Sequence, residues 1–373
     1  MALNIPSEKR RLKILLGLGG CIVAAIVWVL VFAFDATADG SRHDKIGFII
    51  LGDINEAGWN ASHYNGIKAA CDEFGLELLV RDHVKEDSGQ CPAAVEDLVA
   101  QGANVIFLVS FNYAAEVRPL IDKYSNVAFI NTTTLEQAKN MTACFARMYQ
   151  GRYLAGVLAG MRTKSNVIGY VAAVNNSEVC RGINSFALGV QRVNPNAKVL
   201  VMWTGAWQDE ATEAAHARRL IENYGADVLT YHQDEDATAQ VAEQLGADFI
   251  GYNALLEGYS EHYLTSVICH WDLYYKDILQ KYLKGELLAL RNNWIGVKQG
   301  VITLSKYSDA VTPPMRSVLD SVYNELFYNN NLIFSDEIYD NRGQLRCGKN
   351  QVISERELLR NIDWLVKGVE VVE

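Results

Sequence analysis

Residues 46–60, IGFIILGDINEAGWN, contain the pattern that decides the fold. The run from Ile46 to Leu51 is apolar throughout, which predicts a strand buried on both faces of a sheet. A polar loop follows, and the sequence then predicts a helix from Trp59 to Phe74 that ends at a glycine. A buried strand, a polar loop and a helix together form the repeating unit of a parallel sheet covered by helices.

The same unit recurs along the chain in two series. The first series adds predicted strands at 76–80, 105–109 and 127–130, with helices at 91–101 and 114–124. After a long helix predicted at 149–162, the second series has strands at 167–171, 199–203, 228–231 and 249–252, with helices at 182–193, 210–224 and 237–245. The predicted fold class is therefore α/β, with two doubly wound parallel-sheet lobes and a ligand cleft between them.

The order of elements loosens after residue 252. Here the sequence predicts strands at 265–269, 294–297 and 301–304, and helices at 270–283 and 314–328. In chains with two such lobes the late segments cross back between them, so we expect discontinuous domains. We assign residues 45–150 with part of 255–292 to lobe 1, residues 151–254 with part of 293–340 to lobe 2, and residues 341–373 to a C-terminal tail packed on the lobes.

The N-terminal segment predicts a membrane anchor. Residues 14–34 carry no charge, and at about 1.5 Å per residue such a helix can cross a hydrocarbon core of roughly 30 Å. Basic residues precede it, from Lys9 to Lys13, and Asp35 and Asp39 follow it. The bias of positive charge places residues 1–13 in the cytoplasm and everything after the 35–44 linker outside.

Two other fates of this segment stay open. Residues 36–38, ATA, offer a site for signal-peptide cleavage, and residues 18–21, LGGC, resemble a lipoprotein box. The apolar run continues past Cys21 and favours a retained single-pass anchor in the cell membrane. All three fates place the main domain in an extracellular or periplasmic space, where the six later cysteines either form disulfides or stay as buried thiols.

Composition and motifs exclude several classes of function. The net charge of −10 argues against nucleic acid as a partner, because phosphates demand a basic stripe. The cysteines and histidines show no metal-ligand spacing, so we expect no metal and no cofactor. Walker loops, G-x-G-x-x-G after a strand and Ser-x-Gly elbows are missing from the sequence, so we expect a protein that is not an enzyme.

Polar and aromatic residues gather just beyond the predicted strands, where ligands bind in open parallel sheets. The candidate binding residues at these positions are Asp53, Asn55, Trp59, Asn60, Phe111, Asn112, Asn131, Trp207, Asp234 and Asn253. Aromatic faces can stack on a flat heterocycle, while amides and carboxylates meet the donors and acceptors along its edge. The alternative is that each aromatic ring packs under its own loop; three at strand ends favour a binding site.

Several ordered motifs resemble one family. The first is G-D-x-x-x-x-G-W-x-x-x-H, from Gly52 to His63. The others are YQGRYLAG at 149–156, GADV at 225–228, IGY at 250–252, WDLYY at 271–275, WIGVKQG at 294–300 and IDWLVKG at 362–368. From about Lys45 to the C-terminus the chain resembles the basic membrane protein family of ABC-transporter substrate-binding proteins, which is related to the purine-nucleoside receptors of bacteria.

The resemblance implies a type I periplasmic-binding fold that closes by a hinge on a purine base or nucleoside and delivers it to an ABC permease and ATPase. It implies that Trp59 stacks on the base with Asn60 beside it, that Phe111 and Trp207 complete an aromatic cage, and that Asp234 and Asn253 meet polar groups. Many relatives carry an acidic residue after the IGY strand, whereas here Asn253 is followed by ALL. This departure favours a free base over a nucleoside.

A second function stays open, a membrane-tethered ligand sensor or regulator of the same fold that does not transport. A permanent anchor fits tethering. The cytoplasmic tail of residues 1–13 is too short for an output domain, so signalling would require a partner protein. Neighbouring genes for a permease and an ATPase would decide for transport.

Overall fold

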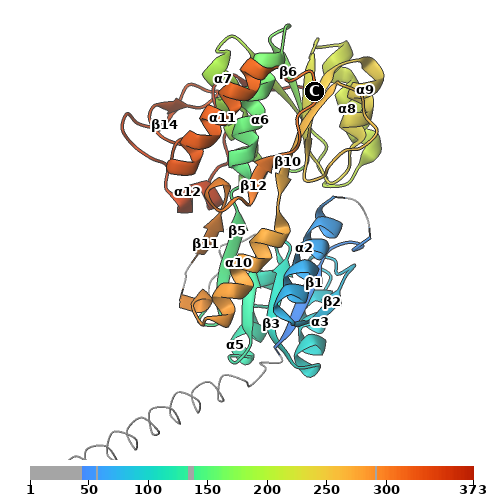
Figure 1. Cartoon of the computed structure of the whole chain (residues 1–373), viewed down its shortest axis with the longest axis vertical. Coiled ribbons are helices and arrows are strands. Elements are labelled where there is room, and N and C mark those ends of the chain that lie inside the picture. The colour runs from blue at the N-terminus through green and yellow to red at the C-terminus, as the bar shows by residue number, and fades with distance from the viewer. Residues whose placement is uncertain (1–43, 56–57, 133–137, 290–291) are drawn as a thin grey trace, which may run out of the picture. The chain divides into compact units, whose positions relative to one another are not determined.

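The computed structural model describes residues 44–55, 58–132, 138–289 and 292–373. The predicted anchor at 14–34 and most of the linker lie outside these residues. Among the helices that are described, none combines the length and the apolar character needed to cross a membrane. Residues 45–373 form one compact unit, which contains two main sheets (Figure 1).

The first sheet has six strands in the order β11-β5-β4-β3-β1-β2, and every neighbouring pair is parallel. Its strands are β1 (Lys45–Ile50), β2 (Glu77–Arg81), β3 (Ala103–Val109), β4 (Ala128–Asn131), β5 (Met141–Ala146) and β11 (Asn292–Ile295). The helices along this part of the chain are α2 (Trp59–Phe74), α3 (Gln90–Ala100), α4 (Tyr113–Glu116), α5 (Arg118–Lys123) and, from later in the sequence, α10 (Trp271–Leu283). The apolar run at 46–51 forms β1, which lies between β3 and the edge strand β2.

The second sheet has seven strands in the order β12-β10-β9-β8-β6-β7-β15. They are β6 (Val167–Ala172), β7 (Lys198–Trp203), β8 (Val228–His232), β9 (Asp248–Tyr252), β10 (Tyr263–Cys269), β12 (Ile302–Leu304) and β15 (Val369–Val371). The helices here are α6 (Met148–Arg162), α7 (Ser177–Val193), α8 (Glu210–Glu222), α9 (Ala237–Leu245) and α11 (Pro313–Tyr328). Within this sheet, among the described strands, only the edge pair β10–β12 is antiparallel, so the predicted α/β class with parallel sheets is confirmed.

The chain passes between the two sheets three times. It leaves the first sheet after β5 and enters α6, returns after β10 through α10, and leaves again after β11 through the short 3₁₀ helix η2 (Val297–Gln299) into β12. Another short 3₁₀ helix, η1 (Leu287–Ala289), follows α10. Each half of the compact unit is therefore built from separate stretches of sequence.

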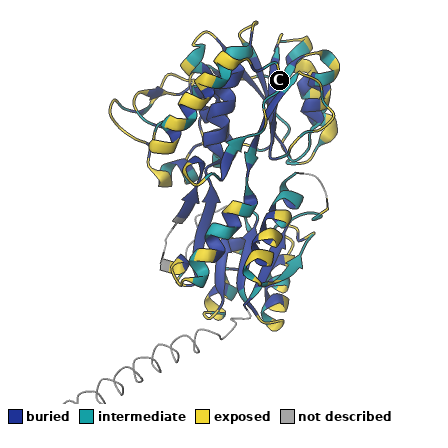
Figure 2. Ribbon diagram, viewed as in Figure 1, coloured by how far each residue is buried: buried dark blue, intermediate teal, exposed yellow. Residues whose placement is uncertain are grey.

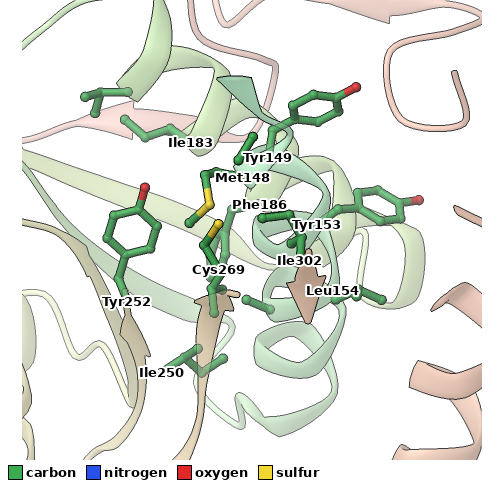
Figure 3. Packing of buried hydrophobic residues seen from close by; sticks show 14 of the residues in the cluster. Met148, Tyr149, Tyr153, Leu154, Ile183, Phe186, Ile250, Tyr252, Cys269 and Ile302 are labelled. Atoms are coloured by element: carbon green, nitrogen blue, oxygen red, sulfur yellow. The ribbon is translucent and has the colours of Figure 1, made fainter. Parts of the chain in front are cut away.

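The buried core runs through both sheets and around the central helix α6 (Figure 2). Figure 3 shows Met148 of this helix together with Phe186, Cys269 and Ile302 of the same buried cluster. Helices α6 and α7 approach closely because α6 carries glycines at their contact. A Cβ atom on Gly156 would lie 1.9 Å from the carbonyl oxygen of Phe186, so even alanine does not fit there.

The C-terminal tail adds structure to the second sheet. It contains β14 (Leu345–Cys347), which pairs with β13 (Ile338–Tyr339) just before the tail, then α12 (Glu355–Arg360) and β15, which pairs in parallel with β7. Asn184 of α7 fixes the tail, because its amide donates to the carbonyl of Trp364 at 2.9 Å and accepts from the amide of Val366 at 2.9 Å. The tail is thus an integral part of the fold.

The six cysteines after the predicted anchor are all free and buried. They are Cys71, Cys91, Cys144, Cys180, Cys269 and Cys347. Of the two states that the sequence leaves open, the structure has buried thiols. Burial raises the pKa of the Cys71 and Cys180 thiols to about 12, which leaves them protonated and unreactive at neutral pH.

Candidate functional site

A narrow cavity of about 80 Å³ lies where loops after the strands of both sheets meet. We call it the aromatic pocket, and it is lined by Leu51, Trp59, Glu86, Ser110, Phe111, Glu178, Trp207, His232, Asp234, Tyr252 and Asn253. Leu51 and Phe111 follow β1 and β3 of the first sheet, while His232 and Tyr252 end β8 and β9 of the second. The pocket therefore occupies the carboxyl ends of parallel strands, the position at which open α/β sheets bind ligands.

The three aromatic side chains predicted from the strand ends all line this pocket. Trp59 begins α2, and its ring lies 4.0 Å from the ring of His63 and 5.4 Å from that of Trp271. The ring of Trp207 lies 6.0 Å from that of His232. Phe111 is 50% exposed, so it is not packed under its own loop. The arrangement offers flat apolar faces with one ring left accessible.

Asp234 and Asn253 line the same pocket, so five of the ten predicted residues come together. The backbone of Asn253 adopts a left-handed conformation, with φ of 58°. Its amide nitrogen donates to the carbonyl of Val267 at 3.0 Å, and its carbonyl accepts from the hydroxyl of Ser62 at 3.3 Å. The side-chain oxygen Oδ1 is buried without a hydrogen-bond partner, which leaves an acceptor for a ligand.

The other five predicted residues do not line the pocket, and four of them make local hydrogen bonds instead. Asn60 accepts from the amide of Gly52 at 3.1 Å and thereby fixes the loop after β1. Asp53 accepts from the backbone and side-chain amides of Asn55 at 2.8 and 2.9 Å. Asn112 donates to Asp87 at 3.1 Å, and Asn131 is fully buried at the end of β4. A position after a strand does not by itself direct a side chain into the cleft.

Five polar or aromatic residues of the pocket were not among the predicted ones. They are Glu86, Ser110, Glu178, His232 and Tyr252. Ser110 and Tyr252 directly precede the predicted residues Phe111 and Asn253, and His232 lies two residues before Asp234, so including every polar residue at these strand ends would have found them. Glu86 lies farther along the loop after β2, where its carboxylate accepts from the hydroxyl of Ser110 and, at 2.8 Å, from the amide of Asn112. No local sequence signal places it in the pocket.

Buried charges stand behind the second-sheet wall of the pocket. Arg152 is fully buried and its guanidinium lies 3.6 Å from the ring centroid of Tyr252, with a hydrogen bond of 2.7 Å to the carbonyl of Tyr231. Burial, with the nearby cations Arg152 and Arg181, holds the pKa of His232 well below its usual value, so its imidazole is neutral at pH 7. Burial also raises the pKa of Glu178, against the opposing effect of the two arginines.

One group of potential metal ligands lies among the described residues, outside the aromatic pocket. Ligand atoms of Asp53, Asp82 and His83 lie within 4.8 Å of one another, and His83 is exposed. The Nε2 atom of His83 is 3.9 Å from a carboxylate oxygen of Asp53. Exposed acidic groups of this kind are common on protein surfaces, and nothing else in the structure points to an ion there.

Two mostly parallel sheets, three crossings between them and a pocket at the strand ends are features of the periplasmic-binding fold that the motifs predict. The model of one family matches residues 43–347 of the chain and describes its members as ABC transporter substrate-binding proteins, PnrA-like. The chain belongs to this family, the basic membrane protein family that its motifs resemble. It is therefore a solute-binding protein of the ABC-transporter type, a class in which the bound molecule is carried rather than converted.

Two curated relatives cover most of the chain. A purine-binding protein of Brucella abortus is 32% identical over 76% of this chain and 81% of its own length. A putative ABC transporter glucose-binding protein of Haloferax volcanii is 30% identical over 87% of this chain and 79% of its own length. The family thus contains proteins named for different small molecules.

Solved structures show the same fold at low sequence identity. A transcriptional activator of the comK gene from Bacillus halodurans aligns with a TM-score of 0.68 and 20% identity, covering 77% of this chain and 98% of that one. A solute-binding protein from Aeropyrum pernix aligns with a TM-score of 0.63 and 15% identity, covering 80% and 93%. At these identities the likeness concerns the fold alone.

Proposed function

We propose that this protein captures a purine base or nucleoside between its lobes and delivers it to the permease and ATPase of an ABC importer. The observation that carries the proposal is the set of three aromatic residues, Trp59, Phe111 and Trp207, around one pocket. Without a ligand, the half-exposed phenylalanine beside two tryptophans leaves apolar ring area in contact with water. A flat ring stacked on these aromatic faces would cover that area. The Brucella relative supports a purine as the ring.

Polar groups around the pocket fit the edge of such a ring. The unpartnered Oδ1 of Asn253 requires a donor, and the carboxylate residues Asp234 and Glu178 line the same pocket. Purines carry N–H donors along their edges, whereas an apolar ligand would leave Oδ1 of Asn253 unpaired at a cost of about 1–3 kcal/mol. Closure around a stacked base removes water from these hydrogen bonds and strengthens them.

The proposed location is the outer face of the cell membrane, with residues 14–34 as a retained anchor. The uncharged run, its basic flank and its acidic end support this orientation. Protease added to intact cells should digest the main domain and spare the N-terminal tail. Recovery of the main domain in the medium would instead point to cleavage.

The function is tested by calorimetry of the full-length chain with adenine, hypoxanthine, guanine, their ribosides and glucose. A purine compound should bind with release of heat and raise the unfolding temperature, because it stabilises only the folded state. Preference for free bases over ribosides would support the argument from Asn253. Binding of glucose alone would overturn the purine proposal and align this chain with the Haloferax relative.

A tethered sensor is the second candidate function. One curated relative, the transcriptional activator protein med of Bacillus subtilis, is 23% identical over 72% of this chain and 84% of its own length. A protein similar in sequence to this chain is thus named for regulation. Genes for a permease and an ATPase beside this one, and loss of purine uptake when it is deleted, would favour transport over sensing.

A further inference from the structure

A second and larger cavity, of about 440 Å³, adjoins the aromatic pocket. We call it the acidic chamber. The two cavities share Trp59, Asp234, Tyr252 and Asn253, so a ligand stacked in the first can extend a substituent into the second. Both volumes taken as one site fall in the range of small-molecule sites, whereas the aromatic pocket alone is narrow.

The charged residues that line the acidic chamber are all acidic. Five carboxylate residues line it: Glu210, Asp234, Glu235, Asp236 and Glu257. Among its described lining residues there is no lysine, arginine or histidine. Asp236 accepts hydrogen bonds from Tyr259 and Gln240, both at 2.9 Å, but neither partner brings a positive charge. Such a concave surface attracts cations and repels anions.

Two buried amide groups give an independent indication of an occupant. Gln233 and Asn253 line the chamber and are only 2% and 9% exposed. The Nε2 atom of Gln233 donates to Thr204 at 2.7 Å, while its Oε1 has no hydrogen-bond partner. The Oδ1 atom of Asn253 likewise has none. A buried acceptor without a partner is costly, and both acceptors here require a group that donates.

Buried ionisable groups of both signs lie behind the chamber. Glu213 of α8 is fully buried and accepts from the amide of Thr238 at 3.0 Å. Burial raises the pKa of Glu213 to about 7, and the charges of Glu235 and Asp236 add to the rise. The buried Arg152 stacks on Tyr252 but lines neither cavity. The negative charge of the chamber therefore lies in its lining, while the layer beneath holds Glu213 and the cation Arg152.

We propose that the acidic chamber is a second subsite, which holds a protonated amine carried by the heterocycle and excludes phosphate. This inference rests on the proposed function and deepens it. An ammonium group has donors and no acceptor, which matches a lining of carboxylates and unpaired amide oxygens. A hydroxyl group offers one donor and no charge, and a phosphate meets five like charges. The favoured ligand class is an amine-bearing purine derivative.

Calorimetry with four probes tests the subsite on the full-length chain at pH 7 and low salt. The probes are adenine, adenosine, 5′-amino-5′-deoxyadenosine and adenosine 5′-monophosphate, which differ in the charge of the substituent. We expect the amine to bind at least about tenfold more tightly than adenosine, and the monophosphate at least about tenfold more weakly. Raising the salt concentration should shrink both differences.

A matched pair of variants locates the effect. Glu257→Gln removes one charge from the lining, whereas Glu261→Gln removes one charge four residues further along, outside the chamber. Both side chains are exposed, so neither change should disturb the fold. The preference for the amine over adenosine should fall about threefold in Glu257→Gln and stay unchanged in Glu261→Gln.

The outcomes separate this inference from the function on which it rests. If adenine or adenosine binds but the amine gains nothing, the subsite is wrong while the purine receptor stands. If Glu257→Gln and Glu261→Gln prefer the amine equally, the subsite is also wrong, because the attraction of the amine would then not come from the carboxylates that line the chamber. If none of the four compounds binds, the proposed function fails and the subsite fails with it.

Discussion

Phe111 is the residue whose exposure argues most directly for a ligand. Its ring is half exposed on the loop after β3, yet it lines a pocket with two tryptophans. An exposed ring contributes little to folding stability, so its removal should act mainly on binding. This separation makes it a better probe than Trp59, which packs against His63 and Trp271 of the core.

We therefore expect Phe111→Ala to weaken the binding of the purine ligand by about tenfold or more, through the loss of stacking and of buried apolar area. The unfolding free energy should change by less than about 1 kcal/mol. Calorimetry and urea unfolding of the full chain measure the two quantities. Phe327→Ala is the matched control, because Phe327 is 36% exposed on α11 and lines neither cavity. Equal affinities of the two variants would contradict the stacking role.

Glu213 makes stability depend on pH. Its folded pKa of about 7 lies above the ordinary 4.5, so between these values the folded state keeps a proton that the unfolded state has released. Stability from protonated Glu213 is fully present below about pH 4.5 and is lost as the pH rises through 7. The loss amounts to roughly 3 kcal/mol at most.

The test compares urea unfolding of wild type and Glu213→Gln at pH 5 and pH 8. Glutamine can still accept from the amide of Thr238 but does not ionise, so the variant should be more stable than wild type at pH 8 by about 2–3 kcal/mol and similar at pH 5. Glu222→Gln, exposed on the same helix, is the control and should follow wild type. A constant difference at both pH values would show that the charge of Glu213 is not the cause.

At the level of elements, the contact between α6 and α7 depends on glycine. Gly156 has no room for a side chain, because a Cβ atom would meet the backbone of Phe186 at 1.9 Å. Gly156→Ala should force the helices apart and lower the unfolding free energy by about 1–3 kcal/mol, although alanine favours a helix. Ser317→Ala on the exposed side of α11 should change it by less than about 0.5 kcal/mol. Urea unfolding would contradict the packing argument if both variants were equally stable.

The elements that the sequence predicts are those with strong local signals. A few consecutive residues are enough to predict the strand β1, from its apolar run, and the end of helix α2, from its glycine. Strand β5, MTACFA, was not predicted, because its small and polar residues give no continuous apolar run. Strand β15 has three residues and exists through its pairing with β7. Such strands depend on distant partners that local pattern does not show.

The candidate site divides in the same way. Trp59, Phe111, Trp207, Asp234 and Asn253 were predicted because the carboxyl end of a parallel strand is a site that topology fixes. The carboxylate of Glu86 enters the pocket through bonds to Ser110 and Asn112, which belong to another strand end. The acidic chamber depends on residues from four separate segments. The resemblance pointed only to one acidic residue after the IGY strand, which this chain lacks, so it gave no indication of this cluster of carboxylates.

At the scale of the whole molecule, Arg147 joins the segments that cross between the sheets. It follows β5 and is 6% exposed. Its guanidinium donates to the carbonyl of Trp294 at 3.1 Å and to the hydroxyl of Tyr149 at 3.0 Å, and it pairs with Glu355 of the tail. One side chain thus connects β11 of the first sheet, the helix α6 that leads to the second sheet, and α12 of the tail.

We expect Arg147→Met to lower the unfolding free energy by about 3 kcal/mol or more. The change leaves the carbonyl of Trp294 and the hydroxyl of Tyr149 without their donor, and it removes the positive charge that pairs with Glu355. Glu355→Gln should cost less than about 1 kcal/mol, since the Glu355 side chain is 49% exposed and water can take its place beside Arg147. Urea unfolding of the full chain measures both. Equal losses would mean that the ion pair, rather than the buried hydrogen bonds at the crossing, holds the segments together, and purine affinity should then fall in both variants alike.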